Sequence, residues 1–381
     1  MAFIPFSTIT FLHNQYRTLS SLCFCLLLTG CQPNTPEAML EDYINRLGNV
    51  LELDASLDLS DIHPTPLPRR RLRLIEEIPV RQGLIEVLEL YQCDLLPLIA
   101  QRNSSLGRVM KPSQKLVYEL KFFVLMRECV ALINTLDTEP EVREQIETIW
   151  QIKQANLPIV LWNSLYNTDE MEANFSASEP PLDLPSDDDS EKRLQQAQFA
   201  SVRLSLQHFK QLSSLARHPQ NWPVPDFIDA IEDDYLTLYS NRFGSRWQRS
   251  LLITTVTLNT GANLIEQRLK SRPFCFPGHS NKKADILMNV FNKFYAARLQ
   301  PYLALIHQQG DVWLSAHETI LAPLQGTLPA AMQDYRQTHL DRQNKKGQWQ
   351  QYQRALQRHT AAWQEILRQC NMMPDRSPKQ T

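Results

Sequence analysis

The fold is decided by residues 349–370, which read WQQYQRALQRHTAAWQEILRQC. Their large side chains recur in alternating steps of three and four residues. These positions are Trp349, Tyr352, Leu356, His359, Trp363, Ile366 and Cys370. Because an α-helix has about 3.6 residues per turn, the steps place all of them on one face. We therefore expect a helix near 343–370 that buries this face in a core.

The same spacing recurs along most of the chain, and glycine is scarce, with 10 residues in 381. Folds rich in turns and phosphate loops use more glycine. The sequence therefore predicts an all-α class, a multi-helix, bundle-like domain with proline-rich loops. A first helix should run from near Pro36 to about residue 51, with Thr35 as its N-cap. The other expected helices cover 79–101, 114–136, 139–155, 157–162, 191–217, 226–240, 245–271, 282–308 and 311–322.

Three local features refine these helices. Proline removes a backbone donor, so Pro97 and Pro301 should kink the helices that contain them. The β-branched run 253–258 leaves a strand open as an alternative there. Helices 79–101 and 114–136 should pair as an αα-hairpin. The expected buried stripe of 114–136 is Tyr118, Phe122, Leu125, Cys129, Leu132 and Leu136.

The predicted helical domain covers 37–374 and has two halves, 37–166 and 192–374. Residues 167–191 between them are rich in Asp, Glu and Pro, which is typical of a solvated acidic linker. The acidic run there lacks the alternating ligands and central glycine of a calcium loop. Residues 375–381 should be a flexible tail.

The N-terminus carries the pattern of a lipoprotein signal peptide. An apolar run of about ten residues suits a signal sequence rather than a membrane span. It ends in Leu28-Thr29-Gly30-Cys31, which resembles the bacterial lipobox. That resemblance implies removal of 1–30, cleavage between Gly30 and Cys31, lipidation of Cys31, and a tether over 31–36. The alternatives are an ordinary signal peptide or a buried helix, and the long N-terminal region leaves the true start open.

The lipobox resemblance also implies a location. Related proteobacterial lipoproteins are retained in the inner membrane by an Asp after the cysteine, and this chain has Gln32. We therefore expect a lipid anchor in the outer membrane, facing the periplasm, with the inner membrane as the alternative. After the signal no apolar run of about 18 residues follows, so the lipid should be the membrane attachment.

Four cysteines remain after the signal and Cys31, and the periplasm is oxidising. Four cysteines allow three pairings. We prefer Cys93–Cys129 and Cys275–Cys370, because each pair lies within one half of the chain. Buried free thiols are the alternative.

A proline-rich segment, 63–68, precedes a basic cluster formed by Arg69, Arg70, Arg71 and Arg73. Alternating prolines favour polyproline II, and the cluster is a candidate patch for a partner or for anionic headgroups. The alternative is a surface strap whose arginines pair with local acids such as Glu76 and Glu77. The formal net charge of −2 gives no global basic field for nucleic acid.

No sequence motif predicts a catalytic residue, a metal or a cofactor, since GxSxG, P-loop, GxGxxG, HExxH and SxxK patterns are missing. His359 lies on an apolar stripe and should be a core residue. The acids Glu232, Asp233 and Asp234 are candidates for a hydrolase pair, with a solvated helix face as the alternative. A group of aromatic residues could line a groove for glycan or peptide, with core packing as the alternative. They are Trp222, Tyr235, Tyr239, Phe243 and Trp247.

Several segments together resemble a family of uncharacterised gammaproteobacterial lipoproteins whose domain has no assigned function. They are the lipobox, Glu37 to Leu51, Asn103-Ser104-Ser105-Leu106-Gly107, Cys275-Phe276-Pro277-Gly278 and Leu299-Gln300-Pro301-Tyr302. We expect a non-enzymatic periplasmic module that binds an envelope protein. The alternatives are a wall-active hydrolase with two carboxylates and a carrier of lipid or a small ligand. The oligomeric state stays open.

Overall fold

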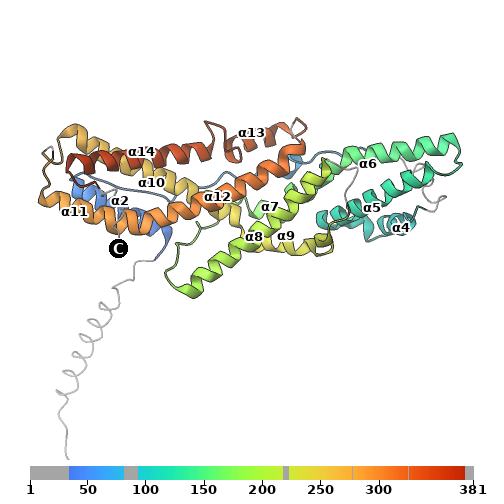
Figure 1. Cartoon of the computed structure of the whole chain (residues 1–381), viewed down its shortest axis with the longest axis horizontal. Coiled ribbons are helices and arrows are strands. Elements are labelled where there is room, and N and C mark those ends of the chain that lie inside the picture. The colour runs from blue at the N-terminus through green and yellow to red at the C-terminus, as the bar shows by residue number, and fades with distance from the viewer. Residues whose placement is uncertain (1–33, 81–92, 218–222, 277, 325, 374–381) are drawn as a thin grey trace, which may run out of the picture.

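The computed structural model describes residues 34–80, 93–217, 223–276, 278–324 and 326–373, and within these ranges it is helical without strands. Figure 1 shows an elongated molecule. Helices α2, α10, α11 and α14 gather at one end, α4, α5 and α6 at the other, and α8 and α12 lie between them. The helices are α2 (Pro36–Leu51), α4 (Leu96–Asn103), α5 (Pro112–Ile133), α6 (Pro140–Tyr166), α7 (Asp169–Ala173), α8 (Asp189–Ala216), α9 (Ile231–Asn241), α10 (Phe243–Ser271), α11 (Lys282–Val290), α12 (Gln300–Leu321), α13 (Ala330–His339) and α14 (Gln348–Gln369).

Helix α14 confirms the prediction from its spacing and packs along α10. Its stripe is buried except at Leu356, which is partly buried, and His359 lies in the core as expected. The hydroxyl of Tyr43, from α2, is 2.7 Å from Nε2 of His359 and accepts a hydrogen bond from Nε1 of Trp363 at 2.9 Å. Gly261 of α10 faces this cluster, and a Cβ there would lie 2.9 Å from His359. The core at this end of the molecule, which we call the proximal end, thus joins three helices that are distant in sequence.

Helix α2 also begins as predicted. The side chain of Thr35 accepts a hydrogen bond from the backbone N–H of Ala38, and Pro36 occupies the first turn. A side-chain cap satisfies one of the N–H groups that a helix start leaves unpaired. The buried face includes Met39, Tyr43, Leu47, Val50 and Leu51.

The prediction of two separate helices, 282–308 and 311–322, is wrong. Residues 282–321 are helical throughout, with α11 passing through the π-helical segment η5 (Phe291–Leu299) into α12. Pro301 lies in the first turn of α12, where a missing N–H does not break the helix. The wider turn precedes this proline, which is where its ring would otherwise crowd the carbonyl four residues earlier. Residues 253–258 lie in α10, so the strand alternative is excluded.

The helices at the other end of the molecule, which we call the distal end, differ more from the predicted ones. Helix α6 continues through Pro158, so the predicted break between 155 and 157 is wrong. Helix α4 starts only at Leu96, which puts Pro97 in its first turn rather than at a kink. Most of the predicted helix 79–101 lies outside the described residues, which omit 81–92. Leu132, in the last turn of α5, and Leu136, beyond its end at Ile133, are exposed, so the predicted stripe is wrong at these two positions. Helix α13 was not anticipated.

Residues 167–191 are not the solvated linker that their composition indicated. They include α7, and the apolar residues Met171, Phe175 and Leu182 among them are buried. Asn174 donates a hydrogen bond to the carbonyl of Leu238 and accepts one from the N–H of Gly244. The few apolar positions in an acidic segment are therefore enough to fix it against α9 and α10.

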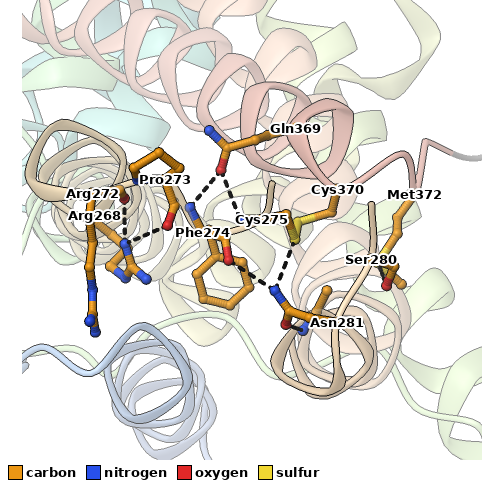
Figure 2. The surroundings of a disulfide bond; sticks show 11 residues. Arg268, Arg272, Pro273, Phe274, Cys275, Ser280, Asn281, Gln369, Cys370 and Met372 are labelled. Carbon is orange, nitrogen blue, oxygen red and sulfur yellow. Dashed lines mark hydrogen bonds between the residues drawn. A yellow bond between two sulfur atoms is a disulfide. The ribbon is translucent and has the colours of Figure 1, made fainter. Parts of the chain in front are cut away.

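The structure contains both disulfides that we preferred. Cys93, before α4, bonds to Cys129 of α5, with 4.9 Å between their Cα atoms. Cys275, in the loop before α11, bonds to Cys370 at the end of α14, with 5.2 Å between Cα atoms. Figure 2 shows the second bond where the loop meets the end of α14. One disulfide therefore lies near each end of the molecule.

Candidate functional site

Residues 54–80, which we call the strap, cross the molecule and place the basic cluster in its distal half. Along its course the carbonyl of Leu59 accepts a hydrogen bond from Arg249 of α10. Further along, the carbonyl of Thr65 accepts one from the hydroxyl of Tyr335 of α13. The predicted proline-rich extended segment is thus tied to two helices before it reaches Arg69.

Two asparagines of α6 then hold the strap. The side-chain amide of Asn163 accepts from the N–H of Ile75 at 3.2 Å and donates to its carbonyl at 2.8 Å. Asn156, two turns earlier, makes the same pair of bonds with Ile78, both at 2.8 Å. Because the amide group mimics a backbone peptide, the strap pairs with α6 without forming a strand.

Arg70 and Arg73 of the basic cluster are neutralised by α7. Arg70 pairs with Asp169 and Glu172, and Arg73, whose side chain is 1% exposed, also pairs with Glu172. Burial raises the pKa of Glu172, but hydrogen bonds from Arg70 and Arg73 outweigh it and hold that pKa below its usual value. The predicted pairing with local acids such as Glu76 and Glu77 is therefore wrong, because the acids that pair with Arg70 and Arg73 lie about a hundred residues away.

The remaining residues of the strap face outward. Arg69 and Arg71 are exposed, and no described carboxylate pairs with either. Leu72, Leu74 and Ile78 are each about half exposed. Pinning by Asn156 and Asn163 fixes the backbone, so these apolar side chains are presented rather than free to fold inward.

A second segment, residues 106–111, projects beside the strap. Leu106 and Val109 are 80% and 75% exposed. The turn that presents them is tight: Arg102 and the hydroxyl of Ser104 bond the backbone of Gly107. A Cβ at Gly107 would lie 2.1 Å from a carbonyl of α4, so only glycine fits. The Cys93–Cys129 disulfide fixes the chain that leads into α4 against α5.

Two hollows lie beside these segments and share Met110. One, of about 350 Å³, is lined by both segments: Arg70, Arg71, Leu74, Glu77, Met110, Pro112 and Lys115 together with residues of α6. The other, of about 470 Å³, lies between α4 and α5 and includes Leu98, Leu106, Met110, Val117, Tyr118 and Lys121. We call the exposed residues of 69–78 and 106–111, with both hollows, the distal face.

The distal face is apolar and carries more cations than acids, with Glu76 of the strap and Glu232 of the second hollow as its acids outside ion pairs. Lys115 pairs with Glu77, and Lys121 with Asp229, so these charges cancel. Arg69, Arg71, Arg108 and Lys111 have no carboxylate partner among the described residues. Exposed apolar side chains rimmed by charge beside a hollow mark interaction sites more often than plain surface. Sequence reasoning found only the 69–73 half; residues 106–111, three apolar and two basic without an acid, carried the missing signal.

Two of the candidate hydrolase acids, Asp234 and Glu232, have hydrogen-bond partners within the fold. The carboxylate of Asp234 is buried and lies 2.8 Å from Nδ1 of His208. Glu232 accepts a hydrogen bond from the hydroxyl of Ser113 at 2.6 Å. Of the proposed aromatic groove, Tyr235, Phe243 and Trp247 are buried and Tyr239 is exposed, while Trp222 lies outside the described residues. Tyr235, Phe243 and Trp247 therefore pack in the core.

Two buried histidines are paired with tyrosines. His317 lies in van der Waals contact with Trp313, and its Nδ1 is 2.5 Å from the hydroxyl of Tyr166. Burial lowers the pKa of both His317 and His359 to about 3, so each is neutral at physiological pH. In the described part of the chain no three His, Cys, Asp or Glu side chains form a metal site.

The lipobox, with Gly30 and Cys31, lies outside the described residues, as does the tail 375–381. Within the described ranges no helix combines the length and the apolar character needed to cross a membrane. No curated protein and no solved structure matches the chain. One family does match, over residues 40–374, and its description is "Protein of unknown function (DUF3080)". Because that match covers nearly all of the helical body, the chain belongs to this family.

Proposed function

We propose that this protein is a non-enzymatic interaction module of the bacterial cell envelope, anchored by lipid on Cys31 to the periplasmic side of the outer membrane. The anchor is supported by the sequence Leu28-Thr29-Gly30-Cys31 behind a short apolar run. The described body supplies no spanning helix and no metal cluster. Its first helix starts at Pro36, five residues after the lipidated cysteine.

The partner is an acidic, amphipathic segment of another envelope protein, and the distal face is its binding site. The observation that carries this proposal is the fixed display of Leu74, Leu106 and Val109 among cations that lack a described partner. Apolar anchors in a hollow supply affinity, and complementary charge supplies orientation and rate of encounter. Figure 1 places α4 and α5 at the opposite end from α11 and α14, which suits a protein partner away from the anchored end.

The anchor is tested by metabolic labelling with a fatty acid and by membrane fractionation. The wild-type chain should incorporate label and sediment with outer membranes, and Cys31→Ser should do neither. A wild-type chain that stays unlabelled and soluble in the periplasm would remove the anchor from the proposal.

The distal face is tested by charge reversal. Cells are treated with a cross-linker, the protein is purified, and the cross-linked partner segment is identified by mass spectrometry. Arg71→Glu with Arg108→Glu should lower the yield of an adduct on an acid-rich, apolar segment about tenfold. Lys192→Glu with Arg203→Glu, two exposed cations of α8, is the matched control and should leave the yield unchanged. Equal loss in both variants, or a partner segment without acids, would contradict the site.

A further inference from the structure

The loop between α10 and α11 is held rigidly at the proximal end. The side-chain oxygen of Gln369, on α14, accepts hydrogen bonds from the N–H groups of Phe274 at 2.6 Å and Cys275 at 3.1 Å. The side-chain amide of Asn281 donates to the carbonyl of Phe274 at 3.1 Å and also caps α11. Figure 2 shows these bonds converging on the Cys275–Cys370 disulfide. The loop is therefore pre-organised.

This rigid loop exposes a phenylalanine. Phe274 and Cys275 are buried, whereas Phe276 directly after them is 83% exposed, more than any other large apolar residue of the described chain. The backbone on its N-terminal side is fixed to α14, so Phe276 projects from a fixed point. A large apolar side chain that a fixed loop exposes to water is a candidate binding contact.

The surroundings of Phe276 are strongly basic. Residues 267–284 contain no Asp or Glu, and their cations are Arg268, Lys270, Arg272, Lys282 and Lys283. Arg272 and Lys283 both pair with one carboxylate, that of Glu52. Arg268 is buried over the ring of Phe274, so four exposed cations face one Glu, which leaves an excess of three positive charges in this segment. This combination, apolar insertion plus basic residues, is the chemistry of binding to an anionic membrane surface.

The position of the loop relative to Cys31 agrees with this chemistry. Helix α2 starts at Pro36 and has 16 residues, which makes it about 24 Å long. Glu52, at its other end, is the residue that pairs with Arg272 and Lys283. The start of α2, which follows Cys31 by five residues in the sequence, and the basic loop near Glu52 therefore lie at opposite ends of one helix, and a membrane that holds one end lies within reach of the other.

We infer that Phe276 and the cations of residues 267–284 form a second membrane contact, which inserts into the headgroup region of an anionic phospholipid surface. This inference rests on the proposed lipid anchor. Two contacts separated by the length of α2 fix the tilt of the elongated body, whereas a single lipid tether leaves it free to rotate. The distal face is then held in a constant orientation toward its partner.

The test uses the acylated full-length product reconstituted into vesicles of phosphatidylethanolamine and phosphatidylglycerol. Phe276→Trp adds a fluorophore at the loop, and Leu236→Trp on α9, where Leu236 is 62% exposed, is the matched control. Fluorescence of each is read as the difference from wild type, because the native tryptophans are shared. Brominated lipids should quench the F276W signal about twofold, as expected for a ring at the headgroup boundary, and should not affect L236W.

Lys270→Glu with Lys282→Glu should reduce the F276W quenching, as should replacing phosphatidylglycerol by phosphatidylcholine. If the protein floats with vesicles but F276W is quenched no more than L236W, the loop contact is wrong and the anchor stands. If the protein does not float, the anchor has failed and the inference falls with it. An F276W signal that changes only when envelope proteins are added would overturn the membrane assignment in favour of a protein.

Discussion

At the residue scale, the buried histidines make stability depend on pH. His317 and His359 have folded-state pKa values of about 3, against about 6.5 in an unfolded chain. Between these values the unfolded state binds more protons, so stability is full above pH 6.5 and falls as the pH drops toward 3. Lowering the pH from 7 to 5 should reduce the free energy of unfolding by about 2 kcal/mol per histidine.

Urea titrations at the two pH values measure this effect. His359→Gln retains an amide that can bond Tyr43 but does not titrate, so it should remove about 2 kcal/mol of the pH dependence, which leaves the shares of His317 and of His339, whose pKa burial also lowers. His279→Gln, in an exposed loop position, is the control and should leave it unchanged. A pH dependence that survives in His359→Gln with His317→Gln would show that other groups cause it.

A second residue-scale prediction concerns the pairing of Arg73. Glu172→Gln removes the carboxylate that neutralises a guanidinium with 1% exposure. A buried charge left without its partner is strongly unfavourable, so the free energy of unfolding should fall by about 2–4 kcal/mol. Glu365→Gln, which breaks an exposed pair with Arg368, should change it by less than about 0.5 kcal/mol. Chemical denaturation compares the two, and equal small effects would contradict the role given to Glu172.

At the element scale, the strap depends on side-chain amides instead of a β-ladder. Asn156→Ala leaves the N–H and carbonyl of Ile78 without their partners. The expected loss is about 1–3 kcal/mol, with faster hydrogen exchange at Ile78 than at distant helical amides. Asn289→Ala, on the exposed side of α11, is the control and should lose less than about 0.5 kcal/mol. Unchanged exchange at Ile78 would mean that the strap is held by its other contacts.

The two disulfides should stabilise to different extents. Their sequence separations are 36 residues for Cys93–Cys129 and 95 for Cys275–Cys370. Loop-closure entropy predicts about 4 and about 5 kcal/mol respectively. Paired Cys→Ser variants, compared by denaturation under oxidising conditions, measure both. If the variants are as stable as wild type, the unfolded chain without the disulfide is as constrained as the unfolded chain with it.

The sequence was most informative where one periodic face is buried against one core. Helices α2 and α14 follow their stripes, and each disulfide joins two cysteines that are near one another in sequence order. It was least informative where tertiary contacts override local signals. Pro158 stays within α6, and buried Met171 and Phe175 order an acidic segment that composition alone marks as solvated. The partners of Arg70 and Arg73 lie about a hundred residues away, beyond the reach of pattern reasoning.

At the scale of the whole molecule, the structure has two ends joined by long helices (Figure 1), and each exposes apolar side chains among cations. The proximal end holds the start of α2 and the basic loop with Phe276. The distal end presents the distal face, with its shape fixed by a disulfide, a glycine turn and two asparagines. Helices α8 and α12 separate the ends, so a membrane contact at one leaves the other accessible.

The central claim is that the distal face binds an envelope protein, and site-specific photo-crosslinking in cells tests it most directly. A photoreactive residue is placed at Leu106 or Val109, and at Leu204 of α8 or Leu236 of α9 as controls of similar exposure class. The account predicts an adduct with one protein, on an acidic and apolar segment, from Leu106 and Val109 alone. The same adduct from all four positions, or none from Leu106 and Val109, would contradict it.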